Sequence, residues 1–481
     1  MAKARKSSFE RLNAMNRKQR RGLRRRLFSA DPWLAIVNPQ AAGIDVGNES
    51  HYVAVPADRD AAAVQEFGCW TADLVRLCEW LQRCRIETVA MQATGVYWIP
   101  LYDQLTQHGI RVVVVNAQYT KNVPGRKTDV QEAQWLMKLH TYGLLPNSFQ
   151  LEREMEKVRT IWRVRDRHVK EAGRAVQHMQ KALTKMNVQL ANVISDISGV
   201  SGQAIIGAIW KGERDPDKLA ALKHERVRAS TEEVARSLEG NWREDVLFEL
   251  RQAVEQHQFA QRQWQECDWQ LERYLRALPG RKREDQVGGQ YAASHPQAGR
   301  VRKPKGNAPA FDLKSALERV AGADLTSIDG IDVMTAQTIL AEVGTDLRAF
   351  ADEDHFASWM GLTPGKDISG GKVIRSGRRK VQNRVAMSLR IAASTLRESQ
   401  SYLGARYRYL CRKLPSKAAA VKAMARHLAV LVYRMLTRGQ AWVDRGAERF
   451  EQRREELDMA SLSKRAAARG LKLVPIAGEI S

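Results

Sequence analysis

The sequence predicts a multidomain protein that begins with an α/β domain and ends in a mostly α-helical domain. Three observations lead to this prediction. The 481-residue chain is long enough for several domains. Short apolar segments and segments of helical spacing interchange between residues 41 and 145. Residues 151–278 then show two long runs of helical periodicity.

The chain is strongly basic. Its 78 Lys and Arg residues outnumber 54 Asp and Glu residues, which gives a formal net charge of +24. This excess favours a polyanionic partner, namely nucleic acid, over the alternative of a solvated basic surface. A membrane surface is the weaker candidate, because the sequence has no lipidation motif and no apolar run long enough to span a bilayer.

The cysteines and the N-terminus indicate the compartment. Five cysteines, an odd number without a Cys-x-x-Cys pair, predict neither a disulfide framework nor a zinc site. The basic N-terminus lacks the apolar segment of a secretory signal. We therefore expect a protein of the reducing cytoplasm.

Composition and periodicity divide the chain into six predicted segments. These are a basic arm (1–40), an α/β domain (41–150), a coiled-coil helical arm (151–279), a basic flexible linker (280–310), a second compact domain (311–445) and a charged tail (446–481).

The α/β domain is expected to contain strands and helices in the order β-β-β-α-β-α-β-α around a central mixed sheet. The predicted strands cover 42–46, 51–56, 63–67, 87–91 and 111–116, and the predicted helices cover 71–84, 97–108 and 129–142.

Two heptad seams follow. In the first, apolar residues recur in steps of three and four from Val169 to Ile197, including Met179 and Leu183. The second runs from Leu247 to Leu278 with a polar middle. An antiparallel helical hairpin, an arm that pairs with another subunit and an ordinary helical bundle all remain possible.

The second compact domain contains a possible phosphate-binding turn. The segment Ser327–Asp332, followed by an apolar helix at 333–343, is typical of a helix-hairpin-helix turn, although a plain αα-hairpin fits equally well. We expect a loop at 365–380, helices near 381–398 and 418–437, and a charged helical tail.

Acidic residues of the α/β domain form a candidate metal site. Asp45 ends the first strand, Gln92 follows the fourth, and Asp129 and Glu132 share one face at a helix start. Four oxygen-bearing side chains gathered beside the first strand suit Mg²⁺ (or Mn²⁺). Alternatively, Asp129 complements the helix dipole and Glu132 belongs to a capping box.

Several motifs follow one another along the chain, at residues 43–47, 93–100, 122–131, 139–145 and 368–372. In this order they resemble the DEDD transposases of bacterial insertion sequences (family one-ten), and most closely their eleven-eleven subgroup. The resemblance implies an RNase H-like (RuvC-like) domain, a coiled-coil arm and a C-terminal transposase domain.

Carried over, the resemblance makes Asp45, Gln92, Asp129 and Glu132 the metal-binding catalytic set. The family usually has Glu where this chain has Gln92, and Asp where it has Glu132. The second difference keeps a carboxylate, whereas the first loses a negative charge but retains a ligating oxygen.

The resemblance also implies a serine nucleophile at Ser369, within Ser369-Gly-Gly. Without it, this segment would be a flexible turn, and Ser376 is the nearby alternative. Surrounding cations would hold the scissile phosphate. The nucleic-acid-binding candidates are Arg126, Lys127, Lys366, Lys372, Arg375, Arg378, Arg379 and Lys380.

The implied reaction is DNA cleavage and rejoining through a phosphoserine, guided by a structured non-coding RNA (a bridge RNA) that pairs with DNA. The implied assembly is a homodimer, and a tetramer during strand exchange, joined by the seam at 169–197. Two other hypotheses remain open: a RuvC-like nuclease that uses only the acidic site, and a catalytically impaired nucleic-acid-binding relic, which Gln92 favours.

Overall fold

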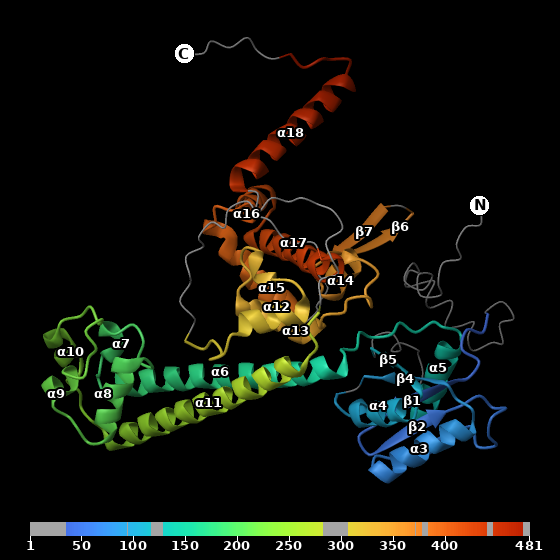
Figure 1. The fold of residues 1–481 in the computed structure, drawn as a ribbon, viewed down its shortest axis with the longest axis horizontal. Coiled ribbons are helices and arrows are strands. Elements are labelled where there is room, and N and C mark those ends of the chain that lie inside the picture. The colour runs from blue at the N-terminus through green and yellow to red at the C-terminus, as the bar shows by residue number, and fades with distance from the viewer. Residues whose placement is uncertain are drawn as a thin grey trace. The chain divides into compact units, whose positions relative to one another are not determined.

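A computed structural model describes residues 35–93, 95–116, 128–281, 306–370, 372–377, 383–439 and 446–474. The chain divides into two compact units, Met1–Gln150 (unit 1) and Leu151–Ser481 (unit 2), coloured along the chain in Figure 1. No helix in the described ranges has both the length and the apolar character needed to cross a membrane.

Unit 1 is built on a five-stranded mixed sheet with the order β3-β2-β1-β4-β5. Strands β1, β2 and β3 pair antiparallel, and β4 and β5 continue the sheet parallel to β1. The strands are β1 (Ala41–Val46), β2 (Ser50–Ala54), β3 (Val64–Gly68), β4 (Thr88–Gln92) and β5 (Arg111–Val115). These bounds agree with the predicted strands to within two residues.

Helices cover both faces of this sheet. Helices α3 (Thr71–Arg83) and α4 (Trp98–Gln107) share an apolar core with one face, which includes Ile44, Met91 and Val114. Helix α5 (Asp129–Thr141) covers the other face, where His140 lies within hydrogen-bonding distance of Thr88. Along β1, Ala42, Ile44 and Val46 belong to this core, whereas Gly43 meets α5, because successive side chains of a strand point to opposite faces.

Unit 2 contains a long antiparallel helical hairpin. Helix α6 (Arg153–Lys185) packs along α11 (Glu244–Ala277). Arg165 bonds Asp268 at one level, and Lys185 bonds Glu249 further along, so the two helices run in opposite directions. The hairpin interpretation of the two seams is therefore confirmed.

The first seam does not continue as one helix to Ile197. Helix α6 ends at Lys185, and Asn187 adopts a left-handed φ of 60°. The chain then enters a cap of short helices at the end of the hairpin (Figure 1). These are α7 (Leu190–Val193), α8 (Val200–Trp210), α9 (Pro216–Ala220) and α10 (Thr231–Ser237).

The expectation that this seam joins subunits is wrong for its central residues. Met179 and Leu183 are 3% and 2% exposed in the single chain. They pack in one apolar core with α11 and the cap, so the return of the chain through α11 already covers them. A subunit interface must use another surface.

The C-terminal part of unit 2 is helical apart from one hairpin. Its helices are α12 (Leu313–Ala321), α13 (Val333–Val343), α14 (Glu353–Trp359), α15 (Arg384–Thr395), α16 (Tyr402–Lys413), α17 (Lys417–Arg438) and α18 (Gly446–Ala467), with 3-10 turns η2 (Leu325–Ser327) and η3 (Leu396–Glu398). Strands β6 (Gly365–Ser369) and β7 (Lys372–Gly377) occupy most of the stretch expected to be a loop.

Two further segments concern expectations from the sequence, and the first differs from its expectation. Arg281, assigned to the flexible linker, donates hydrogen bonds to the carbonyls of Thr345 and Leu436. Gly330, in the turn compared with a helix-hairpin-helix, has a φ of +87°, and a Cβ there would lie 2.7 Å from the Ala392 carbonyl oxygen. That turn therefore packs closely on α15, a contact that both the helix-hairpin-helix turn and the plain αα-hairpin allow. The basic arm at 1–34 and the linker at 282–305 lie outside the described residues.

Candidate functional site

Asp45 and Gln92 lie at the same edge of the sheet in unit 1. The parallel register pairs Ile44 with Met91, so the next residue on each strand is Asp45 on β1 and Gln92 on β4. Side chains at matching positions of paired strands point to the same face. The structure therefore brings these two predicted site residues side by side, with Gln92 buried and Asp45 half-buried.

The direction of helix α5 places the other two predicted residues. Near the start of β1, the amides of Val37 and Asn38 both donate to the carbonyl of Thr141, the last residue of α5. Further along β1, a Cβ on Gly43 would clash with backbone atoms of Ala133 and Met137. Helix α5 thus runs antiparallel to β1, and its first turn approaches the strand end that carries Asp45.

The spacings along the two elements agree with this placement. Asp45 lies about 7 Å beyond Gly43, at about 3.3 Å per strand residue. The turn of α5 that contacts Gly43 spans residues 133–137. Along the helix axis, at 1.5 Å per residue, Glu132 lies about 4 Å and Asp129 about 9 Å from the middle of this turn, toward the helix start. Asp45 is therefore level with the first turn of α5.

Helix α5 begins with a side-chain cap. The Thr128 hydroxyl accepts a hydrogen bond from the Gln131 amide at 3.4 Å. Gln131 is therefore the third helical residue, and the capping-box role considered for Glu132 is wrong. Glu132 is half-buried and Asp129 exposed. The cap leaves both carboxylates at the positively polarised helix start, which favours negative charge.

Tyr52 and Glu66 belong to the same face and were missed in the sequence. Tyr52 pairs with Asp45 across β1 and β2, and Glu66 pairs with Tyr52 across β2 and β3. A hydrogen bond with Glu66, with burial and the charges of Glu66 and Asp129, raises the pKa of the Tyr52 hydroxyl. Alternation in these strands marks their two faces, but only the pairing register brings both residues into line with Asp45.

The donors on this face suit a hard divalent cation. Carboxylate and amide oxygens, the groups of Asp45, Gln92, Asp129 and Glu132, are the ligands that Mg²⁺ accepts. Across the described ranges, however, no three His, Cys, Asp or Glu side chains are grouped to bind one metal ion. The donor chemistry and the placement at one sheet edge therefore fit a metal, whereas a set of three converged acids is not formed.

Ser369 lies in unit 2 at the tip of the β6–β7 hairpin. It pairs with Lys372, and Gly370 between them has a φ of +56°. The positive φ of Gly370 is of the kind that tight two-residue hairpin turns require. Ser369 and Lys372 are both exposed. The hairpin thus presents the serine at a projecting tip with a cation on the facing strand.

Other predicted cations lie on or near this hairpin. The structure describes the backbone of Lys366, Arg375 and Ser376 within the two strands, where Lys366 pairs with Ser376. Arg378, Arg379 and Lys380 lie outside the described residues, as do Arg126 and Lys127 of unit 1.

Comparisons with known proteins found similarity to transposases in two segments of the chain. A comparison with curated proteins gave no match. A family model described as transposase, of the DEDD type of IS110, matches residues 42–188. A second, described as transposase of the IS116/IS110/IS902 family, matches residues 322–408. The first match contains the acidic face and the second contains the Ser369 hairpin. Over both segments, the chain is therefore similar to transposases of the IS116/IS110/IS902 family.

Proposed function

We propose that this protein is an insertion-sequence transposase that cuts and rejoins DNA with an acidic metal site in unit 1 and a serine nucleophile in unit 2. The two transposase matches support the general function. The observation that carries the site assignment is the antiparallel course of α5 over β1, which brings the first turn of α5 level with Asp45. We assign the sheet with this face as RNase H-like (RuvC-like).

Asp45, Gln92, Asp129 and Glu132 would hold Mg²⁺ (or Mn²⁺). Such an ion, when bound, offsets the charge that builds up on a phosphate during strand cleavage. The side chains have separate tasks: the carboxylates supply negative charge, and the buried Gln92 supplies a neutral oxygen beside Asp45. Tyr52 lies beside Asp45 on the neighbouring strand β2, and Glu66 lies beside Tyr52 on β3.

Ser369 is the proposed nucleophile. Its hydroxyl oxygen attacks a DNA phosphorus and loses its proton, a Ser–O–P bond forms, and the bond to the 3′ oxygen breaks. That oxygen leaves as a 3′-hydroxyl after gaining a proton. An exposed position at a hairpin tip gives the hydroxyl access to a phosphodiester, and Lys372 on the facing strand can hold a phosphate oxygen.

The partners follow from the same proposal. DNA is the substrate, and the net charge of +24 agrees with a protein that also holds a structured guide RNA. A composite site formed by units of different subunits requires a homodimer, and a tetramer during strand exchange. Because Met179 and Leu183 are internal, that assembly must use other surfaces.

A second candidate function rests on Gln92. A neutral amide stands beside Asp45 at a position where the similar family usually has an acid, which weakens the attraction for a metal. This observation favours a nucleic-acid-binding protein with impaired catalysis. A nuclease that uses only the acidic site is the other alternative, and it requires no serine.

The deciding experiment traps the covalent intermediate. The full-length protein is incubated with element-end DNA, guide RNA and Mg²⁺, then denatured, digested and analysed by mass spectrometry. We expect a nucleotide adduct on Ser369, its loss in Ser369→Ala and its retention in the matched variant Ser376→Ala. Cleavage that survives Ser369→Ala supports the acidic-site nuclease. Wild-type protein without cleavage, rescued by Gln92→Glu, supports the impaired form.

A further inference from the structure

The outward face of α6 carries an uninterrupted row of basic residues. In steps of three and four, the row contains Arg163, Arg167, Lys170, Arg174, His178, Lys181 and Lys185. We propose that this row, called here the α6 basic row, binds the phosphodiester backbone of a nucleic-acid duplex. The inference rests on the proposed function only in taking the polyanion to be nucleic acid.

The row lies opposite the buried side of α6. The buried residues Arg165, Ala172 and Met179 follow the heptad seam that packs on α11. The basic positions differ from that seam by about half a helical turn, at 3.6 residues per turn. All seven row residues are exposed. From Arg163 to Lys181 the row extends about 27 Å, with a basic side chain about every 5 Å.

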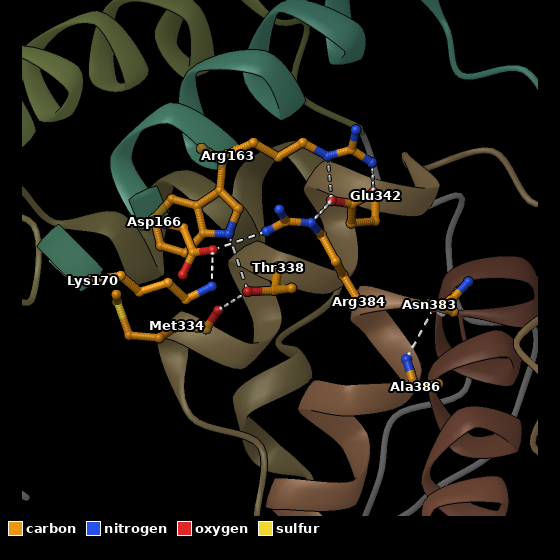
Figure 2. A network of polar contacts seen from close by, with 10 residues as sticks. Arg163, Asp166, Lys170, Met334, Thr338, Glu342, Asn383, Arg384 and Ala386 are labelled. Carbon is orange, nitrogen blue, oxygen red and sulfur yellow. Dashed lines mark hydrogen bonds and ion pairs between the residues drawn. The ribbon is translucent and has the colours of Figure 1, made fainter. Parts of the chain in front are cut away.

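Acidic residues beside the row are already neutralised. Asp166 accepts hydrogen bonds from Lys170 at 2.6 Å and from Arg384 of α15 at 2.9 Å. Glu342 of α13 accepts two from Arg163, at 2.6 and 2.8 Å. Figure 2 shows both acids enclosed by these cations. They therefore cancel little of the charge that the rest of the row presents.

Arg167, Arg174 and Lys181 are the cations available to a ligand. Within the described part of the chain, none of the three forms an ion pair with a carboxylate. A cation held in a pair must give up its partner before it binds a phosphate, whereas these three need not. They are also spaced along one side of the helix, so one backbone can meet all three.

The row borders a hollow of about 380 Å³, a size within the range of small-molecule sites. Four cations of the row and Arg384 line it, and its two acids are Asp166 and Glu171. Asp166 is paired as described, and Glu171 contacts His168 at 3.0 Å. Because Arg163, Lys170 and Arg384 already pair with Glu342 and Asp166, Arg167 and Arg174 are the cations of this hollow that can meet an anionic group.

The partner helix shows how this protein covers an ordinary solvated face. On α11, Arg251 pairs with Glu255 and Arg276 pairs with Glu272, each four residues apart. Such alternation of charge is the usual stabilising pattern on exposed helices. The α6 basic row has no acid at any of its own positions between residues 163 and 185, and in the described ranges only Arg163, Lys170 and Lys185 of the row pair with carboxylates of other positions. The repulsion among the remaining cations favours the binding of an anion.

The test compares two triple variants of the full-length protein. One is Arg167→Ala, Arg174→Ala and Lys181→Ala. The matched control, Arg251→Ala, Arg262→Ala and Arg276→Ala, removes the same charge from exposed positions on α11. Binding to short duplex DNA and to duplex RNA of the same sequence is measured across a salt series. Circular dichroism and thermal melting establish that both variants are folded.

We expect the α6 variant to lose about three phosphate contacts, so its binding to at least one duplex falls less steeply with salt. At a slope of about 0.9 per phosphate on duplex DNA, wild-type protein should lose about 40-fold more affinity than the variant between about 50 and 200 mM salt. The control should keep the wild-type slope. The duplex whose binding becomes less dependent on salt, DNA or RNA, identifies the ligand.

Two results overturn the proposal. One is an α6 variant whose affinity depends on salt as steeply as that of wild type on both duplexes. A row that binds an acidic protein instead of nucleic acid would give this result. The other is an α11 control that loses as much as the α6 variant, which would show a general charge effect. Failure of DNA cleavage by wild-type protein leaves this binding test intact, so the two proposals fail separately.

Discussion

Gly43 of β1 lies so close beneath the carbonyl oxygen of Ala133 in α5 that no side chain fits between them. This contact fixes the distance between the strand that carries Asp45 and the helix that carries Asp129 and Glu132. A glycine at this position is needed for its missing Cβ, because its φ is not in the left-handed region. The close approach of α5 to the strand that carries Asp45 therefore depends on the absence of a Cβ at residue 43.

We predict that Gly43→Ala separates α5 from β1. The added Cβ meets backbone atoms that cannot rotate away, so the expected cost is about 1–3 kcal/mol of unfolding free energy, as for other overpacked sites. Strand transfer should fall much further than stability, because Asp129 and Glu132 move with the helix. Chemical denaturation and a cleavage assay on the same sample measure the two effects.

Gly173→Ala is the matched control for this substitution. Gly173 lies on the exposed face of α6, and a Cβ there meets nothing within 4 Å. Alanine should stabilise the helix by up to about 1 kcal/mol and leave cleavage unchanged. A Gly43→Ala protein as stable and active as wild type would mean that the α5–β1 contact does not organise the site.

Gln92→Glu should make the stability of unit 1 depend on divalent cations. A buried carboxylate beside Asp45 adds repulsion when no metal is bound and adds a ligand charge when one is. We expect a lower melting temperature in chelator, and a larger rise on adding Mg²⁺ than wild type shows. The exposed substitution Gln107→Glu at the end of α4 is the control. Equal Mg²⁺ responses in all three proteins would argue against a metal at Gln92.

The buried ion pair between Arg165 and Asp268 should be a major constraint on the α6–α11 hairpin. Arg165 is 1% exposed, and it also donates to the Asn307 carbonyl at 2.6 Å. Asp268→Asn leaves the charge of the Arg165 guanidinium uncompensated, which should lower the unfolding free energy by about 3–5 kcal/mol. Glu255→Gln, which breaks an exposed pair with Arg251, should cost less than about 1 kcal/mol. Urea denaturation measures the unfolding free energy of both variants. Similar losses in the two would contradict the distinction between a buried and an exposed ion pair.

The attachment of α5 to the sheet should weaken in mild acid. Burial, reinforced by the charge of Arg111, lowers the pKa of His140 to about 4. In the unfolded chain this histidine titrates near 6.5, so between the two values the unfolded state binds more protons. The stabilisation is complete above pH 6.5 and is lost as the pH falls toward 4, by about 3 kcal/mol in total.

Hydrogen exchange of the α5 amides across this pH range measures the effect. His140→Gln cannot be protonated, so its α5 protection, corrected for intrinsic exchange, should vary less with pH than that of wild type. His108→Gln, at the end of α4, should behave as wild type. A pH dependence that persists in His140→Gln would place the titrating group elsewhere.

The elements of unit 1 could be predicted because their local patterns agree with their environment. The short apolar run at 42–46 and the alternation at 51–56 reflect strands of a packed sheet, and the predicted helix at 129–142 covers that sheet. The sequence also marks Asp45 and the Asp129–Glu132 pair. It does not mark Tyr52 or Glu66, because their position opposite Asp45 depends on strand register, which arises from tertiary pairing.

Unit 2 was less predictable for two physical reasons. The apolar period continues past Lys185 into Leu190 and Ile197, but those side chains serve the core of the cap, and Asn241 donates to the carbonyl of Met186 where α6 ends. The β6–β7 strands are rich in Gly, Lys and Arg, so local propensity favours a loop. Their pairing, closed by the turn at Gly370, forms the hairpin instead.

The antiparallel pairing of α6 with α11 also means that the common length of these two helices sets how far the cap extends. One heptad added to α6 alone would shift every later contact out of register, whereas one heptad added to both helices would carry the cap about 10 Å further out with its packing unchanged. Insertions and deletions in this part of the chain should therefore be tolerated only in matched pairs. Reach, rather than chemistry, would be the property that such paired changes alter.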